Sequence, residues 1–124
     1  MAKEYVKFSV SPEMVEKTFK LVENCNKDGK IRIGINEATK AIEGNAAKLI
    51  ILAEDIEPAE IAMHIPLLCK EKNIPLTYVP TRKELGAAAG IEVSTAAIAI
   101  IKEGDKKAFA DIIKKAGELS KEEK

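Results

Sequence analysis

The sequence predicts a three-layer α/β/α sandwich, with helices on both faces of a central sheet. Segments with apolar residues at helical spacing alternate with short apolar segments typical of strands, from one end of the chain to the other. No internal repeat, low-complexity stretch or linker interrupts this alternation. At 124 residues the chain can build one core, so we expect a single domain over residues 1–124, with a mobile tail at about 121–124.

Two helices and two strands are predicted in the first half. Ser11-Pro12-Glu13 combines an N-cap residue, a proline for the first helical position and an acid for the first turn. Gly44-Asn45 is a stop signal for a helix that begins near Asn36. Alternating and continuous apolar patterns predict the strands. The expected elements are a helix at about 12–26, a half-buried strand at 30–33, a helix from 36 to the stop at 44–45, and a strand at 49–53 buried on both faces.

The second half continues the alternation. Pro58 can open a third helix, and Pro66 is expected to break or kink it because proline lacks an amide donor, which leaves two short helical pieces. The remaining expected elements are a strand at 76–79, a short helix at 83–89, a strand at 96–101 and a helix from 105 to about 120.

Composition limits the possible functions. The 20 basic and 20 acidic residues give a net charge of zero, so composition alone gives no indication of nucleic acid, although a local basic face can still exist. Cys25 and Cys69 lack a metal-binding spacing and are expected to be reduced, packed thiols. No apolar run has the length of a signal or a membrane span, so we expect a cytoplasmic protein without a membrane partner.

Three features could indicate an enzyme or a ligand-binding domain. Glu54, Asp55 and Glu57 cluster after a strand and could act as paired acids or metal ligands, but acids near a helix start are more often capping charges. Gly86–Gly90 is rich in small residues and lacks phosphate-loop spacing, but it could let the backbone of a ligand approach closely. The single histidine, His64, lies among apolar residues and is expected to be packed or partly exposed rather than catalytic. A small α/β enzyme or ligand-binding domain built on the acidic cluster is the alternative hypothesis.

A strand-to-helix junction carries a more informative group of side chains. Asn36 and Glu37 lie at a helix start, and Lys40 lies one turn above Asn36. A carboxylate can accept from the N1 and N2 hydrogens of guanine, while an ammonium donates to O6 or N7. An ordinary helix start also favours Asn and Glu at these positions, so the trio alone leaves both interpretations open.

Four blocks of sequence occur in an order and spacing that resemble one known family. They are Gly-Ile-Asn-Glu-Ala-Thr-Lys at 34–40, Leu-Ile-Ile-Leu-Ala-Glu-Asp at 49–55, His-Ile-Pro-Leu-Leu-Cys at 64–69 and Leu-Gly-Ala-Ala-Ala-Gly-Ile-Glu-Val at 85–93. Together they cover almost everything from about residue 12 to 101. The chain resembles archaeal large-subunit ribosomal proteins of the L-seven-Ae family.

This resemblance implies a sandwich around a four-stranded mixed sheet, with no catalysis, no cofactor and no small-molecule substrate. It implies binding to the kink-turn, an internal RNA loop bent sharply around tandem sheared G·A pairs. Family members of this type occur in the large ribosomal subunit with its 23S RNA, in box C/D and box H/ACA guide-RNA particles for 2′-O-methylation and pseudouridylation, and in ribonuclease P. The implied partners are these RNAs and the core proteins of the guide particles.

The resemblance also implies a set of RNA-binding residues. Asn36, Glu37 and Lys40 match the readers of the G·A guanines, with the Gly34 backbone close to the RNA. Two arginines match positions that contact the RNA backbone, although they could also be ordinary solvated surface arginines. A further group of residues matches the pocket and loop that hold a flipped-out nucleotide. The backbone contacts are Arg32 and Arg82, and the pocket and loop residues are Glu57, Ile61, Ile91, Glu92 and Val93.

Some positions depart from the family pattern, and one loop sequence indicates which RNA motifs the protein should bind. Ile33 stands where many relatives have a basic residue, and Gly44-Asn45 replaces a more usual Arg-Gly, which leaves the guanine readers intact and the number of phosphate contacts open. Because the expected basic contacts are few, RNA affinity should depend only shallowly on salt. Glu92-Val93 resembles the archaeal loop rather than the eukaryotic Ser-Arg-Pro, which predicts tolerance of kink-turns and shorter kink-loops. A relative of the same fold that binds another RNA, or only proteins, is a third hypothesis.

Overall fold

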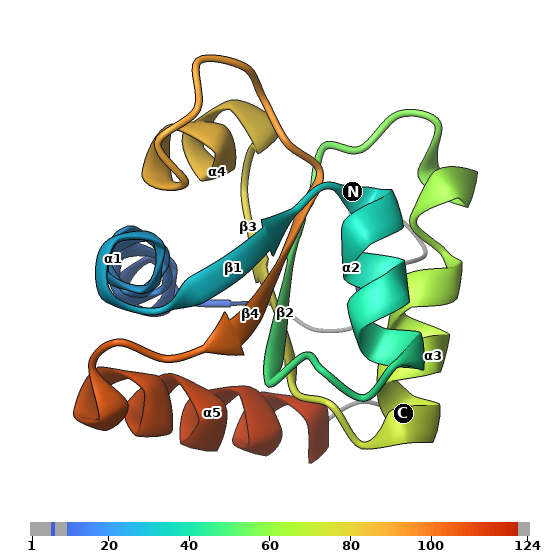
Figure 1. The fold of residues 1–124 in the computed structure, drawn as a ribbon. Coiled ribbons are helices and arrows are strands. Elements are labelled where there is room, and N and C mark those ends of the chain that lie inside the picture. The colour runs from blue at the N-terminus through green and yellow to red at the C-terminus, as the bar shows by residue number, and fades with distance from the viewer. Residues whose placement is uncertain (1–5, 7–9, 122–124) are drawn as a thin grey trace.

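Helices cover both faces of one sheet, as the sequence predicts (Figure 1). The computed structural model describes Val6 and residues 10–121, with side chains as far as residue 118. Apart from the backbone of Lys121, the tail expected to be mobile lies outside the described residues. In chain order the elements are α1 (Pro12–Asp28), β1 (Lys30–Ile33), α2 (Ile35–Glu43), β2 (Leu49–Ala53), the 3-10 helix η1 (Ala59–Ile61), α3 (His64–Lys72), β3 (Leu76–Val79), α4 (Arg82–Ala88), β4 (Ala97–Lys102) and α5 (Lys106–Lys121).

The sheet has four strands in the order β1-β4-β2-β3 and is mixed. Strands β2 and β3 are parallel, whereas β4 runs antiparallel to both of its neighbours, β1 and β2. Therefore β1, β2 and β3 all point the same way. Helices α1, α4 and α5 lie on one side of the sheet, and α2 and α3 lie on the other (Figure 1).

Aliphatic side chains fill the core between these layers. Every residue of β2 and β3 is buried, which confirms the interpretation of the 49–53 run as a strand covered on both faces. Cys25 and Cys69 are buried thiols, and burial raises the pKa of Cys69 to about 12. Both cysteines therefore serve as small packed side chains, as expected.

Local sequence accounts for the helix starts. The Ser11 hydroxyl accepts from the Met14 amide at 3.2 Å, and Pro12 occupies the first turn of α1. The Asp105 carboxylate accepts from the Lys107 and Ala108 amides and so caps α5 from just outside the helix. None of the described helices is both long enough and apolar enough to cross a membrane.

The position of Pro66 corrects one expectation. Two helical pieces do occur, but the break lies at Ala62 and Met63, before the proline. Pro66 is the third residue of α3 and is buried there. A proline in the first turn of a helix removes no intrahelical hydrogen bond, because the first four amides of a helix have no partner within it.

Candidate nucleic-acid interface

The segments that carry the expected site residues meet at one edge of the sheet. Because β1, β2 and β3 are parallel and β4 is antiparallel, the ends of the first three strands and the start of β4 lie at the same edge. The loops after β1, β2 and β3 and the loop before β4 all emerge there, at the top of Figure 1. We call this the loop edge.

Gly34 fixes the junction between β1 and α2. Its φ of 104° lies in a region that L side chains rarely adopt, and its amide donates to the Ala97 carbonyl at the start of β4, at 2.8 Å. No side chain caps α2 at this position. The first amides of α2 therefore face the loop edge, where a helix N-terminus attracts anions.

The trio of expected guanine readers lies on the first turns of α2. Asn36 is exposed, and the side chains of Glu37 and Lys40 are 46% and 74% exposed. Lys40 Nζ lies 3.6 Å from Glu37 Oε2, so the ammonium pairs with the carboxylate three residues earlier. An exposed pair of this kind contributes only about 0.3–0.5 kcal/mol, so an RNA base can replace it with little loss.

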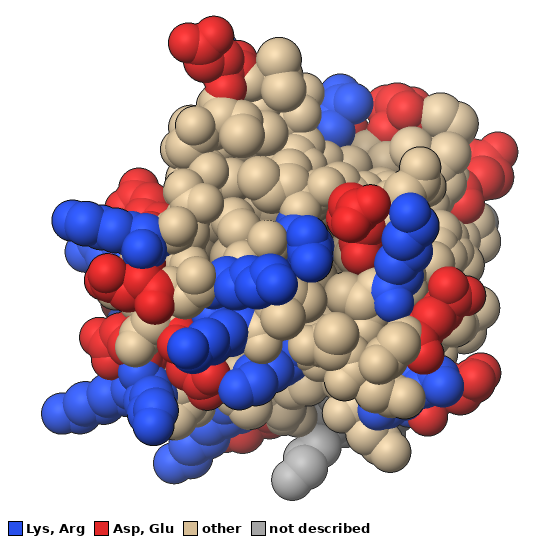
Figure 2. Space-filling model, viewed as in Figure 1, with Lys and Arg blue, Asp and Glu red and all other residues tan. Residues whose placement is uncertain are grey.

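A second group at the loop edge is apolar. Ile61, in η1, is 46% exposed, and Val93, in the loop between α4 and β4, is 70% exposed. Ile91 is half-buried in the same loop. In Figure 2 the surface over this loop is largely uncharged. The exposed acids Glu57 and Glu92 belong to the same two loops.

The backbone of the loop between α4 and β4 is held in place although Val93 is exposed. The Ile91 amide donates to the Gly86 carbonyl, and the Thr95 amide donates to the Arg82 carbonyl, both at 3.1 Å. Gly86 packs directly against the Val93 carbonyl, so a Cβ at position 86 would overlap it. The sequence pattern suggested close backbone approach at Gly86–Gly90, and here the approaching backbone is the protein's own loop.

Arg82 is tied to the acidic cluster. Its amide donates to Asp55 Oδ1 at 2.9 Å, and its Nε lies 3.5 Å from the same oxygen without a hydrogen bond to any described residue. The side chains of Arg82 and Asp55 are each about 40% exposed, at 40% and 43%. Asp55 therefore anchors the start of α4, while the guanidinium keeps part of its surface at the loop edge.

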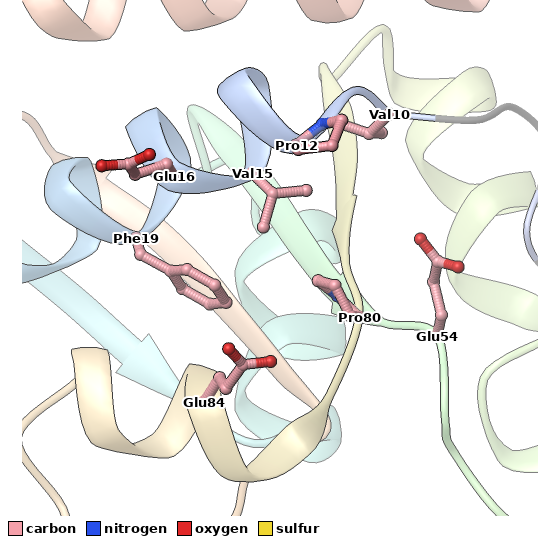
Figure 3. A pocket seen from close by; sticks show the side chains of 8 residues that line it. All are labelled: Val10, Pro12, Val15, Glu16, Phe19, Glu54, Pro80 and Glu84. Atoms are coloured by element: carbon pink, nitrogen blue, oxygen red, sulfur yellow. The ribbon is translucent and has the colours of Figure 1, made fainter.

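The rest of the acidic cluster does not converge on a catalytic or metal site. Glu54 lines a groove, and burial raises the pKa of its carboxyl group. No group of three His, Cys, Asp or Glu side chains able to hold a metal ion is found among the described residues. The groove, with a volume of about 350 Å³, was missed by sequence reasoning because its walls come from three separate segments (Figure 3): Val10, Pro12, Val15, Glu16, Phe19, Glu54, Pro80 and Glu84.

His64 has a structural contact that the sequence did not predict. Its Nε2 lies 3.0 Å from Thr39 Oγ1, and the Thr39 hydroxyl donates to the Ile35 carbonyl at 2.8 Å. With that proton used, the imidazole must be the donor. His64 is exposed, as one of the two expectations for it allowed, and it links α3 to α2, the helix that carries the expected guanine readers.

Two comparisons with known proteins agree with this architecture. The solved structure of the Giardia lamblia 15.5kD RNA binding protein is similar to this chain with a TM-score of 0.80 and 27% sequence identity, over 97% of this chain and 98% of that one. The model of the Ribosomal protein L7Ae/L30e/S12e/Gadd45 family matches residues 16–110. That match includes every expected site residue and every strand of the sheet. The chain therefore belongs to the Ribosomal protein L7Ae/L30e/S12e/Gadd45 family.

Proposed function

We propose that this protein binds RNA and recognises the kink-turn through its loop edge. One observation carries the proposal: a polar trio on α2 and an exposed apolar loop lie at the same edge, joined by the Gly34–Ala97 hydrogen bond. The similar Giardia lamblia protein is named as an RNA-binding protein, which supports RNA as the ligand. The polar trio can hydrogen-bond to the edges of bases, and the neighbouring apolar side chains can cover an unstacked base, so the two groups together suit a bent RNA.

The trio would read the guanines of the sheared G·A pairs. The Glu37 carboxylate accepts from guanine N1 and N2 hydrogens, and Lys40 and Asn36 supply donors on the same helix face. On binding, Glu37 exchanges its weak contact with Lys40 for contacts to a base. The uncapped first turn of α2 supplies amide donors and a partial positive charge beside the RNA backbone.

The apolar group would cover the nucleotide that leaves the stack at the bend. Val93 and Ile61 are exposed in the protein alone, and an unstacked base can bury them. Gly86 holds the backbone of the Val93 loop in one position, so little ordering is needed when RNA binds. Glu57, Ile91 and Glu92 complete the surface around this nucleotide.

The function of the protein would then be to stabilise the kinked shape of the RNA. RNA that fluctuates between extended and kinked forms shifts toward the kinked form because only that form matches the loop edge. Arg32 and Arg82 contribute contacts to the RNA backbone, and the Arg82–Asp55 contact pre-orients one of them. We extend the proposal to shorter kink-loops and to the ribosomal, guide-RNA and ribonuclease P particles of the archaeal family type, with no enzymatic step.

The test is a titration with two RNAs in a gel-shift assay. One RNA carries a kink-turn, and the other has its G·A pairs replaced by Watson–Crick pairs. Tight binding to the first that is lost with the second supports the proposal. Equal binding to both, or binding to neither, would contradict kink-turn recognition and favour another RNA or a protein partner for this fold.

A further inference from the structure

A line of basic side chains, unpaired within the described part of the chain, leads away from the loop edge along β1. Lys30 and Arg32 are both exposed and, two residues apart on a strand, project from the same face. Lys102, the last residue of β4, is exposed and lies directly opposite Lys30 in the strand register. Figure 2 shows Lys and Arg side chains gathered over β1 and the end of β4. We call Lys30, Arg32 and Lys102 the β1 basic strip.

Among the described residues the strip has no acidic partner, as is true of several other exposed lysines such as Lys70 and Lys83, whereas some lysines are paired. Lys48 pairs with Glu103 at 2.8 Å, and Lys17 pairs with Asp111 at 3.4 Å. No carboxylate among the described residues lies within 4.0 Å of a charged nitrogen of the strip. Moreover, like charges placed directly opposite each other on neighbouring strands are destabilising. The strip thus keeps a concentrated positive charge that folding alone does not favour.

The β1 basic strip begins next to the proposed interface and runs away from it along β1. Arg32 precedes Gly34 by two residues, so it lies next to the junction that positions the guanine readers. Lys30 lies about 7 Å further from the loop edge, which is two residue rises of a strand. Lys102 widens the strip at that point. A ligand seated on the readers and extending along β1 would meet these charges in succession.

We propose that the β1 basic strip, through Lys30 and Lys102, binds the phosphate backbone of one helical stem that extends from the RNA bound at the loop edge. This inference rests on the proposed function. The ammonium groups read no base, so they add affinity for a stem of any sequence. They would give a chain with zero net charge a local group of positive charges, which begins at Arg32 next to the readers and continues along β1.

The inference changes the expected salt dependence. The small number of expected basic contacts predicted a shallow slope, and that should hold for an RNA whose stems end close to the kink. Each phosphate neutralised by a lysine adds roughly one unit to the slope of log affinity against log salt concentration. An RNA with a stem long enough to reach Lys30 and Lys102 should therefore give a slope steeper by about two units.

The test compares two variants on matched RNAs. Lys30→Gln/Lys102→Gln removes two charges of the strip, and Lys20→Gln/Lys70→Gln removes two charges from exposed positions on α1 and α3. Each is titrated at several salt concentrations against a kink-turn RNA with both stems short, and against two RNAs with one or the other stem extended. Thermal melts of the variants verify folding, and we expect the strip variant to be at least as stable as the unsubstituted protein because a like-charge pair is removed.

We expect the strip variant to lose several-fold in affinity, and about two units of salt slope, for the RNA with one particular stem extended. Its affinity for the short RNA should stay close to that of the control variant. Equal behaviour of the two variants on all three RNAs, with the kink still recognised, would overturn the inference and leave the proposed function intact. Loss of kink recognition by the unsubstituted protein would overturn both.

Discussion

The two edges of the sheet treat their polar groups in opposite ways. At the edge opposite the loop edge, Lys48 pairs with Glu103 at 2.8 Å and the Asn24 side chain accepts from the Asp105 amide at 2.7 Å. These contacts join segments that are distant in sequence. At the loop edge the side chains of Asn36 and Val93 are exposed instead. The opposite edge thus carries contacts that hold distant segments together, beside the exposed Lys30 and Lys102. The loop edge keeps donors and apolar area exposed, although Asp55 and Arg82 also pair there.

Two glutamates show the same contrast in their ionisation. The hydrogen bond from Lys48 lowers the pKa of the Glu103 carboxyl group at the cross-linked edge. Burial in the groove raises the pKa of the Glu54 carboxyl group at the loop edge, and none of the described residues that line the groove is a cation. The charge of Glu103 is thus stabilised by its ion-pair partner, and the charge of Glu54 is destabilised by burial beside the proposed interface.

The largest expected effect is on RNA affinity and concerns Glu37. Glu37→Ala should weaken binding to a kink-turn RNA by roughly 5- to 150-fold, which corresponds to the loss of about 1–3 kcal/mol from a bidentate base contact. The thermal stability of the protein should hardly change, because the pair with Lys40 is exposed. Glu43→Ala, at the other end of the same helix, is the control and should bind normally. Unchanged affinity of Glu37→Ala would count heavily against the guanine-reading role.

Gly86→Ala should affect both folding and binding. The new Cβ would overlap the Val93 carbonyl, so the loop between α4 and β4 has to move, at a cost of about 1–3 kcal/mol in the free energy of unfolding. Affinity for RNA should fall because the same loop presents Val93. Chemical denaturation and RNA titration measure the two effects.

The control for Gly86 is another helical glycine. Gly117→Ala in α5 places a Cβ where no described residue outside its own stretch of helix lies within 4 Å, so it should stabilise the protein by about 0.5–1 kcal/mol and leave RNA binding unchanged. If both variants were equally stable, close packing against Val93 would not be the reason for a glycine at position 86.

Val93→Ser should give a smaller effect, confined to binding. At 70% exposure the side chain contributes little to the core, so the melting temperature should be nearly unchanged. Loss of apolar contact with an unstacked base should lower RNA affinity by a few-fold, since burying one methylene contributes about 0.8 kcal/mol. Leu67→Ser, which alters an equally exposed apolar residue on α3, serves as the reference. Similar affinities of the two variants would remove Val93 from the interface.

The smallest expected effects are changes in the pH dependence of stability. Glu103 has a lowered pKa in the folded protein, so its contribution is present above its unfolded pKa of about 4.3 and is lost as the pH falls through the folded value. Glu54 has a raised pKa, so its contribution is present below the unfolded pKa and is lost as the pH rises through the folded value. Lys48→Met should therefore make the free energy of unfolding less dependent on pH on the acid side. Glu54→Gln should make it less dependent on pH just above the unfolded pKa, and should raise stability at neutral pH. Thermal melts across this range would contradict the assignment if the two variants had parallel profiles.

Most of the secondary structure could be predicted because its determinants are local. Alternation at Lys30–Ile33 and the apolar run at Leu49–Ala53 predicted strands that coincide with β1 and β2. Pro66 was misjudged because a proline that breaks a helix and one that occupies its first turn look alike in sequence. Only the structure distinguishes the two cases, because it ends η1 at Ile61 and begins α3 at His64, two residues before the proline.

The site was partly predictable for the same reason. Asn36, Glu37 and Lys40 lie within two helical turns, so their proximity follows from helix geometry, although the pairing of Lys40 with Glu37 rather than its position above Asn36 emerged only in the structure. The Arg82–Asp55 contact joins residues 27 positions apart and has no local signature. The RNA-binding roles of all these residues remain predictions.

By itself, the sequence determined the periodicities that make the helices and strands, the glycine at the β1–α2 junction and the chemistry of the α2 trio, because each depends on neighbours along the chain. The tertiary structure decided which segments meet. Insertion of β4 between β1 and β2 brings the Val93 loop to Gly34 and sets Lys102 beside Lys30. Strand order and register arise from packing and hydrogen bonding across the whole domain, and such long-range pairings leave no pattern in any local stretch of sequence.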